Sequence, residues 1–464
     1  MSAGQLALLA AAGVLLGGGA SAQAADLGGN CCADLEERIA ELEATTARKG
    51  NRKVKLEVSG QVNEAVIFWD DSVEDNVGVY TNDASRTRFR FKGDAKIADD
   101  WKAGYLLEVG VRGANSKRFN QDNPVSVSGT DTGLDLRHST WYIDSKKLGR
   151  VWMGLTGGAS ESITEINVAG TDVVAKYSDA EDLGGDLALR RPDGLYSNGT
   201  NNVVAPNGQI SIRRLIRAGT GNQPGEGRRY NMVRYDTPEI FGFVGTANWG
   251  ADDTWEVGLR YKGEFAGLKV AAGIAYGEAN EPTNASGQVG HVVGFECATG
   301  SATTVDPKCH QVGGSISVMH EASGLYVNFG AGYLKDDRIR ELVAQSNAAL
   351  ADEVDDQSEF WAVEAGIQQK WNSLGKTTIF GQYYNNDGGT FSSSSANFGA
   401  GIGNRIKSSE LDIYSLGVMQ GLDNAAMNVY ALYRHVEAEA TSLSGNTVQF
   451  EDVDLFMTGA IIKF

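Results

Sequence analysis

The stretch Trp255-Glu-Val-Gly-Leu-Arg-Tyr-Lys262 decides the fold, because its side chains alternate strictly between two kinds. Trp255, Val257, Leu259 and Tyr261 are apolar, and the residues between them are Glu, Gly, Arg and Lys. Successive side chains of a β-strand point to opposite faces, so a period of two predicts a strand with one apolar and one polar face.

The same alternation recurs along most of the chain after residue 53. It is clear in residues 268–276, 325–333 and 427–433, and the stretch 86–92 places Arg and Lys on one face and Phe on the other. Counting such runs predicts sixteen strands, at 54–69, 86–96, 102–113, 136–143, 150–156, 229–236, 242–250, 254–264, 268–277, 311–321, 325–335, 357–371, 376–387, 410–420, 425–437 and 450–464.

Three features indicate that the apolar faces meet lipid. Aromatic residues such as Trp249, Trp361 and Tyr433 lie near the ends of the runs, as in the girdles of membrane barrels, and the opposite faces are charged or Gly. Short connections such as 265–267 alternate with long polar ones such as 278–310. We therefore predict an all-β fold, a transmembrane antiparallel β-barrel of about sixteen strands.

The amino terminus predicts export. The first 24 residues carry no charged side chain, and an apolar run ends in Ala20-Ser-Ala-Gln-Ala24, which offers overlapping A-x-A cleavage sites. This is the form of a secretory signal peptide. We expect residues 1–24 to be removed, residues 25–52 to form a periplasmic extension, and residues 53–464 to form the barrel.

Residues 33–47 have the one clear helical period. Leu35, Ile39 and Leu42 are spaced by four and three residues, as at the core positions of a coiled coil. Two heptads are too short for a stable isolated pair. A short amphipathic helix on the barrel and a trimeric periplasmic coil therefore remain alternatives, and in the second Cys31 and Cys32 could link neighbouring chains.

Cys297 and Cys309 flank a polar segment and most simply close one loop by a disulfide, which an oxidising compartment permits. Neither cysteine pair has C-x-x-C spacing, and no two histidines have the helical spacing of a zinc site, so no metal and no cofactor are expected. Nothing resembles a nucleophile elbow, so no enzymatic activity is expected. The net charge of −18 argues against a nucleic-acid partner.

Several stretches, in this order, carry a family resemblance. They are Cys31-Cys-Ala-Asp-Leu-Glu-Glu-Arg-Ile-Ala-Glu-Leu-Glu43, Ser85-Arg-Thr-Arg-Phe-Arg-Phe-Lys-Gly93, Ile97-Ala-Asp-Asp-Trp-Lys102, Arg234-Tyr-Asp-Thr-Pro238 and the terminal Phe464. Together they resemble the general porins of Gram-negative bacteria, most closely those of alphaproteobacteria, and the first stretch is similar to the leader of rhizobial-type porins. In this family the final aromatic residue is expected to be the signal read by the assembly machinery.

The resemblance implies a homotrimer in the outer membrane, in contact with lipid and lipopolysaccharide, with a third external loop folded into each barrel as a constriction. Here that loop would run from about residue 157 to 229, and its carboxylates would face a ladder of wall arginines. The candidates are Arg86, Arg88, Arg90, Arg137 and Arg150 on the wall and Glu161, Glu165, Asp172 and Asp179 on the loop. Glu181, Asp182 and Asp186 are interpreted as acids that merely solvate an exposed loop.

The implied function is passive diffusion of small hydrophilic solutes and ions through a water-filled channel. Opposed rows of charge in a narrow passage order water and disfavour apolar solutes. The net charge predicts a weak cation preference, which the wall arginines could reverse. Two alternatives stay open: a substrate-selective channel whose third loop sets specificity, and a porin that also anchors the outer membrane to peptidoglycan through residues 26–50.

Overall fold

The computed structural model describes residues 53–124, 133–199, 209–216, 223–250, 254–279, 309–391, 398 and 401–464. Lys53–Phe464 forms one compact unit. Among the described residues, no helix is both long and apolar enough to cross a membrane. The predicted signal peptide, the Cys31 and Cys32 link and the helix with Leu35, Ile39 and Leu42 lie outside these ranges.

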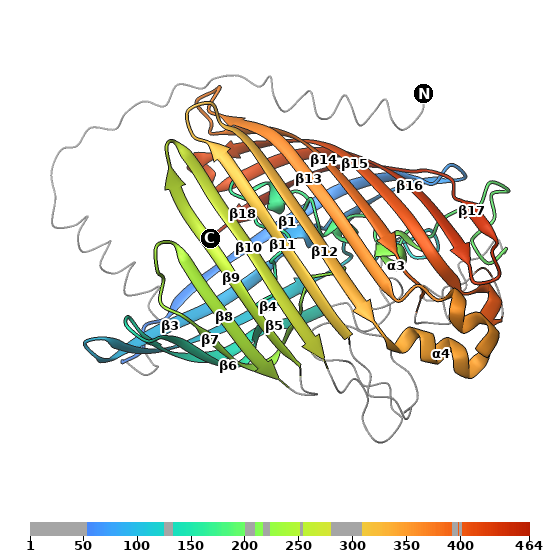
Figure 1. Cartoon of the computed structure of the whole chain (residues 1–464). Helices are drawn as coiled ribbons and strands as arrows, with labels where there is room; N and C mark the ends of the chain where they lie inside the picture. The colour runs from blue at the N-terminus through green and yellow to red at the C-terminus, as the bar shows by residue number, and fades with distance from the viewer. Residues whose placement is uncertain are drawn as a thin grey trace. The chain divides into compact units, whose positions relative to one another are not determined.

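Eighteen strands form one sheet that closes on itself (Figure 1). In chain order they are β1 Glu57–Asp70, β2 Asp75–Thr81, β3 Arg88–Ala98, β4 Trp101–Arg112, β5 Gly133–Ser145, β6 Gly149–Gly157, β7 Arg229–Asp236, β8 Phe243–Gly250, β9 Trp255–Phe265, β10 Leu268–Ala279, β11 Cys309–His320, β12 Leu325–Asp336, β13 Gln357–Gln369, β14 Thr377–Gly388, β15 Ile406–Leu422, β16 Met427–Ser442, β17 Thr447–Gln449 and β18 Val453–Lys463. All paired strands are antiparallel, and β1 pairs with β18 from Gln61↔Lys463 to Asp70↔Asp454, which closes the barrel.

The predicted sixteen-stranded barrel is confirmed. β2 and β3 pair with the two halves of β1, and β17 and β18 pair with the two halves of β16, so each of these pairs is one broken strand in a barrel of sixteen. The first break was not predicted. It is the 3₁₀ turn η1 (Asp83–Ser85), which forms because the Asn82 side chain accepts a hydrogen bond from the Ala84 backbone N–H.

The barrel has one rim of short turns and one rim of long loops. At the short-turn rim, Phe265-Ala266-Gly267-Leu268 joins β9 to β10 through two residues with positive φ, 51° and 77°, the type I′ geometry that matches strand twist. At the long-loop rim, β12 and β13 are joined by α4 (Arg338–Ser346) and the 3₁₀ helix η4 (Ala348–Glu353). In membrane barrels the short turns face the periplasm and the long loops face outward.

Apolar side chains cover the outer face of the barrel. Aromatic side chains form a belt below the long-loop rim, in which Trp255 contacts Tyr276 and Tyr383 contacts both Trp361 and Tyr414. This belt comprises Trp249, Trp255, Tyr276, Tyr333, Trp361, Tyr383, Tyr414 and Tyr433. It therefore follows β8 to β16 and matches the predicted girdle.

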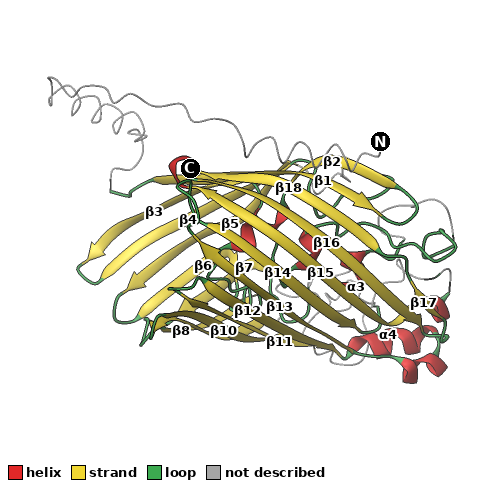
Figure 2. Ribbon diagram, turned by 90° about the horizontal axis from the view of Figure 1, so that it is seen from above, coloured by secondary structure: helices red, strands yellow, loops and turns green. Residues whose placement is uncertain are grey.

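We call the chain between β6 and β7, residues 158–228, the inner loop, and its described part lies inside the ring of strands (Figures 1 and 2). Its described part contains η2 (Thr171–Val173), η3 (Ala180–Asp182) and α3 (Ile212–Ile216). Val174, Leu187 and Leu215 of the loop belong to one buried apolar cluster with Phe380 and Leu432 of the wall. One side of the lumen is thereby filled, because apolar loop residues pack against apolar wall residues. Two further 3₁₀ turns, η5 (Ile402–Asn404) and η6 (Asp423–Ala425), lie in other connections.

Candidate functional site

Polar wall residues of β9, β11 and β13 hold the first part of the inner loop. Glu256 accepts hydrogen bonds from the Ser160 backbone N–H and hydroxyl, at 2.8 and 2.6 Å. The Val168 backbone N–H donates to the Ser317 hydroxyl at 2.9 Å, and the Thr171 hydroxyl donates to Glu364 at 2.6 Å. Both glutamates have no exposed surface, so their carboxyl oxygens serve to bind the loop.

The next part of the loop is held by donors on β1, β14 and β16. The Asn63 side-chain amide donates to the Val173 carbonyl at 3.0 Å, and the Gln382 amide donates to the Ala175 carbonyl at 3.0 Å. Arg434 of β16, 2% exposed, donates to the carbonyls of Ala180 at 2.6 Å and Leu183 at 3.1 Å. This guanidinium binds the two ends of the turn that carries η3, and thereby positions the acids on that turn.

Glycines of the wall lie in close contact with the backbone of the last part of the inner loop. A Cβ atom on Gly313 would lie 2.2 Å from the Gly225 carbonyl oxygen, and one on Gly332 would lie 2.0 Å from the Pro224 carbonyl oxygen. Neither approach is possible for a residue with a side chain unless the backbone shifts. These lumen-facing glycines are therefore needed for close contact between loop and wall, and not only for a smooth water-filled surface.

A cavity of about 430 Å³ remains between the inner loop and β3 to β7. Eight basic residues line it: Arg86, Arg88, Lys117, Arg118, Arg137, Lys176, Arg228 and Arg229. Eight acidic residues also line it: Asp83, Asp135, Glu161, Glu165, Asp179, Glu181, Asp182 and Glu226. The lining is therefore strongly charged but formally balanced.

The wall cations of the cavity differ in how they are paired. Arg86 contacts Asp135 at 2.7 Å and Asp83 at 3.0 Å, and Arg137 contacts Glu108 at 2.6 Å. Arg88, in contrast, has no carboxylate partner among the described residues. Its guanidinium is therefore available to a passing solute.

Arg229 pairs with Glu161 across the cavity. Burial opposes ionisation of Glu161, but the charge of Arg229 prevails and holds the pKa of this carboxyl at about 2. The pair is therefore ionised throughout the physiological range, with the positive charge on the wall and the negative charge on the inner loop.

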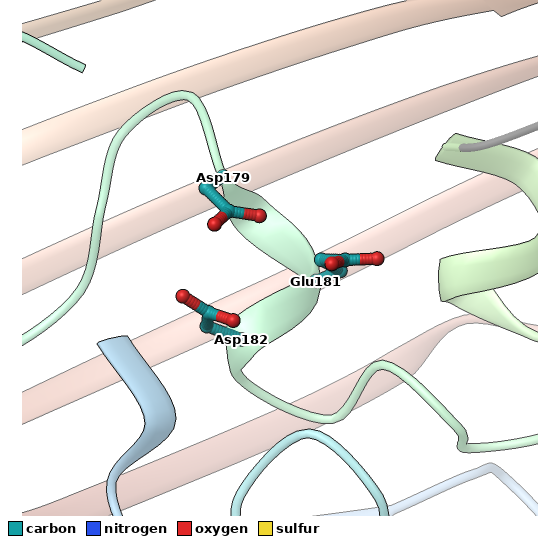
Figure 3. A group of neighbouring side chains, drawn as sticks. All are labelled: Asp179, Glu181 and Asp182. Carbon is teal, nitrogen blue, oxygen red and sulfur yellow. The ribbon is translucent and has the colours of Figure 1, made fainter. Parts of the chain in front are cut away.

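Three acids of the inner loop, Asp179, Glu181 and Asp182, project from the turn around η3 (Figure 3). One oxygen atom of each lies within 4.8 Å of the others. Lys176 contacts Asp179 at 3.0 Å and Asp182 at 3.5 Å, and Lys117 pairs with Glu181 and, at 3.3 Å, with Asp182. Two lysines thus supply the counter-charge that such close carboxylates require.

Burial and mutual repulsion give the acids of the loop different proton affinities. Burial, with the neighbouring charge of Asp182, raises the pKa of Asp179 to about 7. Burial also opposes ionisation of Asp182, but Lys117 and Lys176 lower the pKa of this group. Burial and the nearby Glu165 raise the pKa of Glu226 well above its usual range. The ionised lining at neutral pH is therefore slightly more positive than the formal balance.

The structure brings together most of the residues predicted for the constriction. Arg86, Arg88, Arg137, Glu161, Glu165 and Asp179 all line the cavity. Three candidates do not. Arg90 pairs with Glu108 outside the cavity, Arg150 contacts Asp144 at 2.9 Å and stacks on Tyr142 and Trp152, and Asp172 lies on η2 away from the lining.

The interpretation of Glu181, Asp182 and Asp186 as acids of an exposed loop is wrong. They are 2%, 5% and 7% exposed, and Asp186 pairs with Arg213 at 2.6 Å. The loop is buried in the lumen, so an acid on it must find a cation. The cations that bind these acids include Lys117 of the β4–β5 connection, which alternation could not identify because it lies outside any strand.

Two other predicted sites are partly described. Cys309 is disulfide-bonded, but its predicted partner Cys297 lies outside the described ranges, so the pairing stays a prediction. The Phe464 backbone N–H donates to the Gly60 carbonyl at 3.0 Å, and its carbonyl accepts from Gly60 at 2.8 Å. The terminal residue thus extends the β1–β18 seam.

The chain matches known proteins in fold and family. Solved structures similar to it include the anion-selective porin from Comamonas acidovorans (12% identity, 89% of this chain and 100% of that chain, TM-score 0.50). They also include the outer membrane channel DcaP of Acinetobacter baumannii (12% identity, 90% of this chain and 100% of that chain, TM-score 0.47). A third is OmpT of Vibrio cholerae (13% identity, 90% of this chain and 99% of that chain, TM-score 0.46). No curated protein sequence matches the chain.

The family model for Gram-negative porins matches residues 7–441, which is most of the chain. With the closed barrel and the charged cavity inside it, the match identifies both family and role. The chain belongs to the Gram-negative porin family and forms an outer-membrane channel for passive diffusion.

Proposed function

We propose that the charged cavity between the inner loop and β3 to β7 is the constriction of a general pore for small hydrophilic solutes and ions. The observation that carries this proposal is the opposition of Arg86, Arg88 and Arg229 on the wall to Glu161 and Glu165 on the loop. Such opposed charges produce a transverse field that orders water, so apolar solutes must displace ordered water to pass.

The selectivity of this pore should be weak. The whole chain carries a net charge of −18, but the cavity lining carries equal numbers of acidic and basic residues. Because burial and Glu165 raise the pKa of Glu226, the negative charge of this acid is weakened relative to the formal balance. We therefore favour a slight preference for anions over the cation preference that the net charge alone predicts.

A planar-bilayer recording of the purified protein under a KCl gradient tests both statements. We expect steady ohmic channels and a small reversal potential of the sign that anion preference gives. A clear cation preference would contradict the role of the lining. Saturable block by one class of solute would instead support a substrate-selective channel.

We propose that three such barrels associate, as expected in this family. The aromatic belt supports this, because it is interrupted. At the same distance from the long-loop rim, β2 and β5 carry exposed aliphatic side chains instead. Their exposed fractions are 57% for Val77, 67% for Val79, 72% for Leu134 and 51% for Leu136. A patch without belt aromatics suits contact with a neighbouring protein better than contact with the lipid interface. Chemical cross-linking in detergent, with Val79→Glu as the disrupting variant, checks this: trimers should be lost in the variant.

The rest of the proposal concerns the amino terminus and membership of the rhizobial-type group within the porin family. Residues 25–52 would form a periplasmic extension of the rhizobial type, with a possible role in binding peptidoglycan, and Cys31 and Cys32 would join neighbouring chains. Retention of the protein on isolated peptidoglycan, and its loss when residues 26–50 are deleted, would support anchoring. Non-reducing peptide mapping checks the Cys297–Cys309 bridge.

A further inference from the structure

A buried arginine at the long-loop rim has no partner for its charge. Among the described residues, three arginines are at least nine-tenths covered: Arg190, Arg405 and Arg434, at 5%, 8% and 2% exposed. Arg190 pairs with Asp71 and Glu74, and Arg434 donates to two carbonyls of the inner loop. The side chain of Arg405, which directly precedes β15, forms no hydrogen bond or ion pair within the described part of the chain. Its Nε and Nη1 atoms are nevertheless enclosed.

The backbone around Arg405 places this side chain on the face of the sheet that α4 and η4 cover. The register Ile406↔Ser442 between β15 and β16 continues to Arg405 and Leu443, where the Leu443 backbone N–H donates to the Arg405 carbonyl at 2.9 Å. Residues opposite each other in a sheet share one face. Leu443 belongs to a buried apolar cluster with Ile339 of α4. The Arg405 side chain therefore leaves the sheet on the side of this cluster, at the end of the barrel where Figure 1 shows α4.

The carboxylates of this region do not neutralise Arg405. Glu353 of η4 pairs with Lys407 at 2.7 Å, and Asp352 lies 3.6 Å from Arg340 of α4. Burial lowers the pKa of the Arg405 guanidinium, and no carboxylate of the described chain lies close enough to raise it. An arginine keeps its proton in proteins even so. A positive charge is therefore enclosed here without a negative one.

The flanking connections do not contain the missing charge. Residues 389–404, between β14 and Arg405, include no Asp or Glu, and neither do residues 443–446, between β16 and β17. Covering an unpaired charge is costly, because it loses its contact with water and gains nothing in return. A covered cation that its own chain does not neutralise therefore points to a negative group that comes from outside.

We propose that Arg405, beneath α4 and η4, binds a compact oxyanion of the phosphate class. Nε and Nη1 carry three N–H groups that meet no acceptor. Phosphate oxygens are strong acceptors, and the rigid guanidinium matches their geometry better than an ammonium group does. The long-loop rim lies beyond the aromatic belt, at the level of lipid headgroups. The phosphate group can thus be part of a headgroup or a dissolved ion, and the chemistry of its recognition is the same.

The site is separate from the constriction, because Arg405 does not line the charged cavity. An anion bound to Arg405 would instead hold α4 and η4 against the ends of β15 and β16, since it would supply the charge that this covered face lacks. The expected consequence is that the stability of these two helices depends on phosphate.

Hydrogen–deuterium exchange of the full-length protein in a phosphate-free nonionic detergent tests the proposal. Backbone amides of residues 338–353 and 402–406 should exchange more slowly in potassium phosphate than in potassium chloride of the same ionic strength. With phosphate at about ten times its dissociation constant, exchange should slow roughly tenfold, because binding favours the closed state by the factor 1 + [L]/Kd. Arg405→Met should abolish this effect, and Arg405→Lys should reduce it, because lysine keeps the charge but not the fork of donors.

Arg340→Met is the matched control, since Arg340 lies on α4 but is half-exposed and lies beside Asp352. It should keep the full effect of phosphate. Any general stabilisation by phosphate should appear equally in every variant. None of these side chains lines the cavity, so single-channel conductance verifies that each barrel is folded.

A second arm of the experiment distinguishes the two sources of the anion. Micelles that contain phosphatidic acid replace dissolved phosphate, and micelles that contain dioleoylglycerol serve as the uncharged counterpart. Slower exchange with phosphatidic acid alone would assign the site to a lipid headgroup, and slower exchange with dissolved phosphate would assign it to a free ion. No protection by either probe, or equal protection in Arg405→Met, would overturn the proposal.

Discussion

The two sides of the lumen wall use their polar side chains in opposite ways. On the open wall, from β3 to β7, Arg86, Arg88 and Arg229 face the cavity. On the covered wall, from β9 to β16, Glu256 and Glu364 have no exposed surface and accept hydrogen bonds from the inner loop. Both walls are polar because their side chains alternate with the same period of two. The polar side chains of the open wall face water and solutes, whereas those of the covered wall bind a segment of the same chain. Polarity on the inner face of a barrel is therefore not evidence of a wetted surface.

The largest effect is expected from removing a buried carboxyl group of the covered wall. Glu364→Ala leaves the Thr171 hydroxyl and the Asn328 amide without this acceptor, and the Gln382 amide keeps only its hydrogen bond to the Ala175 carbonyl. Each unsatisfied buried group costs roughly 1–3 kcal/mol, so the free energy of unfolding in lipid vesicles should fall by about 2–4 kcal/mol. The inner loop should also become sensitive to protease.

Glu359→Ala is the control for this change, since Glu359 is on the same strand but exposed on the outer face. It should alter the unfolding free energy by less than about 0.5 kcal/mol. Equal losses in both variants would show that Glu364 acts through the strand and not through the loop.

A second variant displaces the loop from the covered wall without removing charge. In Gly313→Ala, the new Cβ would lie 2.2 Å from the Gly225 carbonyl oxygen, so the loop backbone must move. We expect a loss of about 1–3 kcal/mol, as for overpacking, together with altered single-channel conductance. In Gly381→Ala the nearest atom is 3.8 Å away, so conductance should stay unchanged.

Substitutions of arginines on the open wall should alter ion selectivity and leave the free energy of unfolding nearly unchanged. Arg88→Gln removes the cavity guanidinium that has no carboxylate partner, and the permeability ratio should shift roughly twofold towards cations. Arg150→Gln removes an arginine that lies outside the cavity beside Asp144, and should give a smaller shift. Reversal potentials measure both, and equal shifts would contradict the assignment of the cavity as the constriction.

The smallest expected effect is that of pH on the ion selectivity of the channel. Burial and Asp182 raise the pKa of Asp179 to about 7 against the opposing charges of Lys176 and Lys117, so this acid loses its negative charge as pH falls. Anion preference should therefore increase from about pH 8 to about pH 6. Asp179→Asn should remove this dependence, and an unchanged pH profile in the variant would exclude Asp179 as its source.

The sequence predicted the strands, but it did not predict which part of the lumen wall the inner loop covers. Alternation assigned Arg86 and Arg88 to the lumen, because an inward position depends only on local order. Local order could not show that Arg88 lines the cavity and Arg150 does not, since this depends on where the inner loop folds, which begins eight residues after Arg150. Lys117 was missed for the same reason, because its partner Glu181 is far away in the chain and neither residue lies on a strand.

The seam between β1 and β18 has a consequence for the timing of assembly. It joins residues about 400 positions apart, from Gln61↔Lys463 onward. No other pairing among the strands that the structure describes spans such a distance, and closing so long a segment carries a large entropic cost before any contact forms. Until the seam forms, β1 and β18 present unpaired backbone groups that can pair with another chain. Pairing of β18 with β1 therefore determines when this protein stops exposing strand edges that can aggregate.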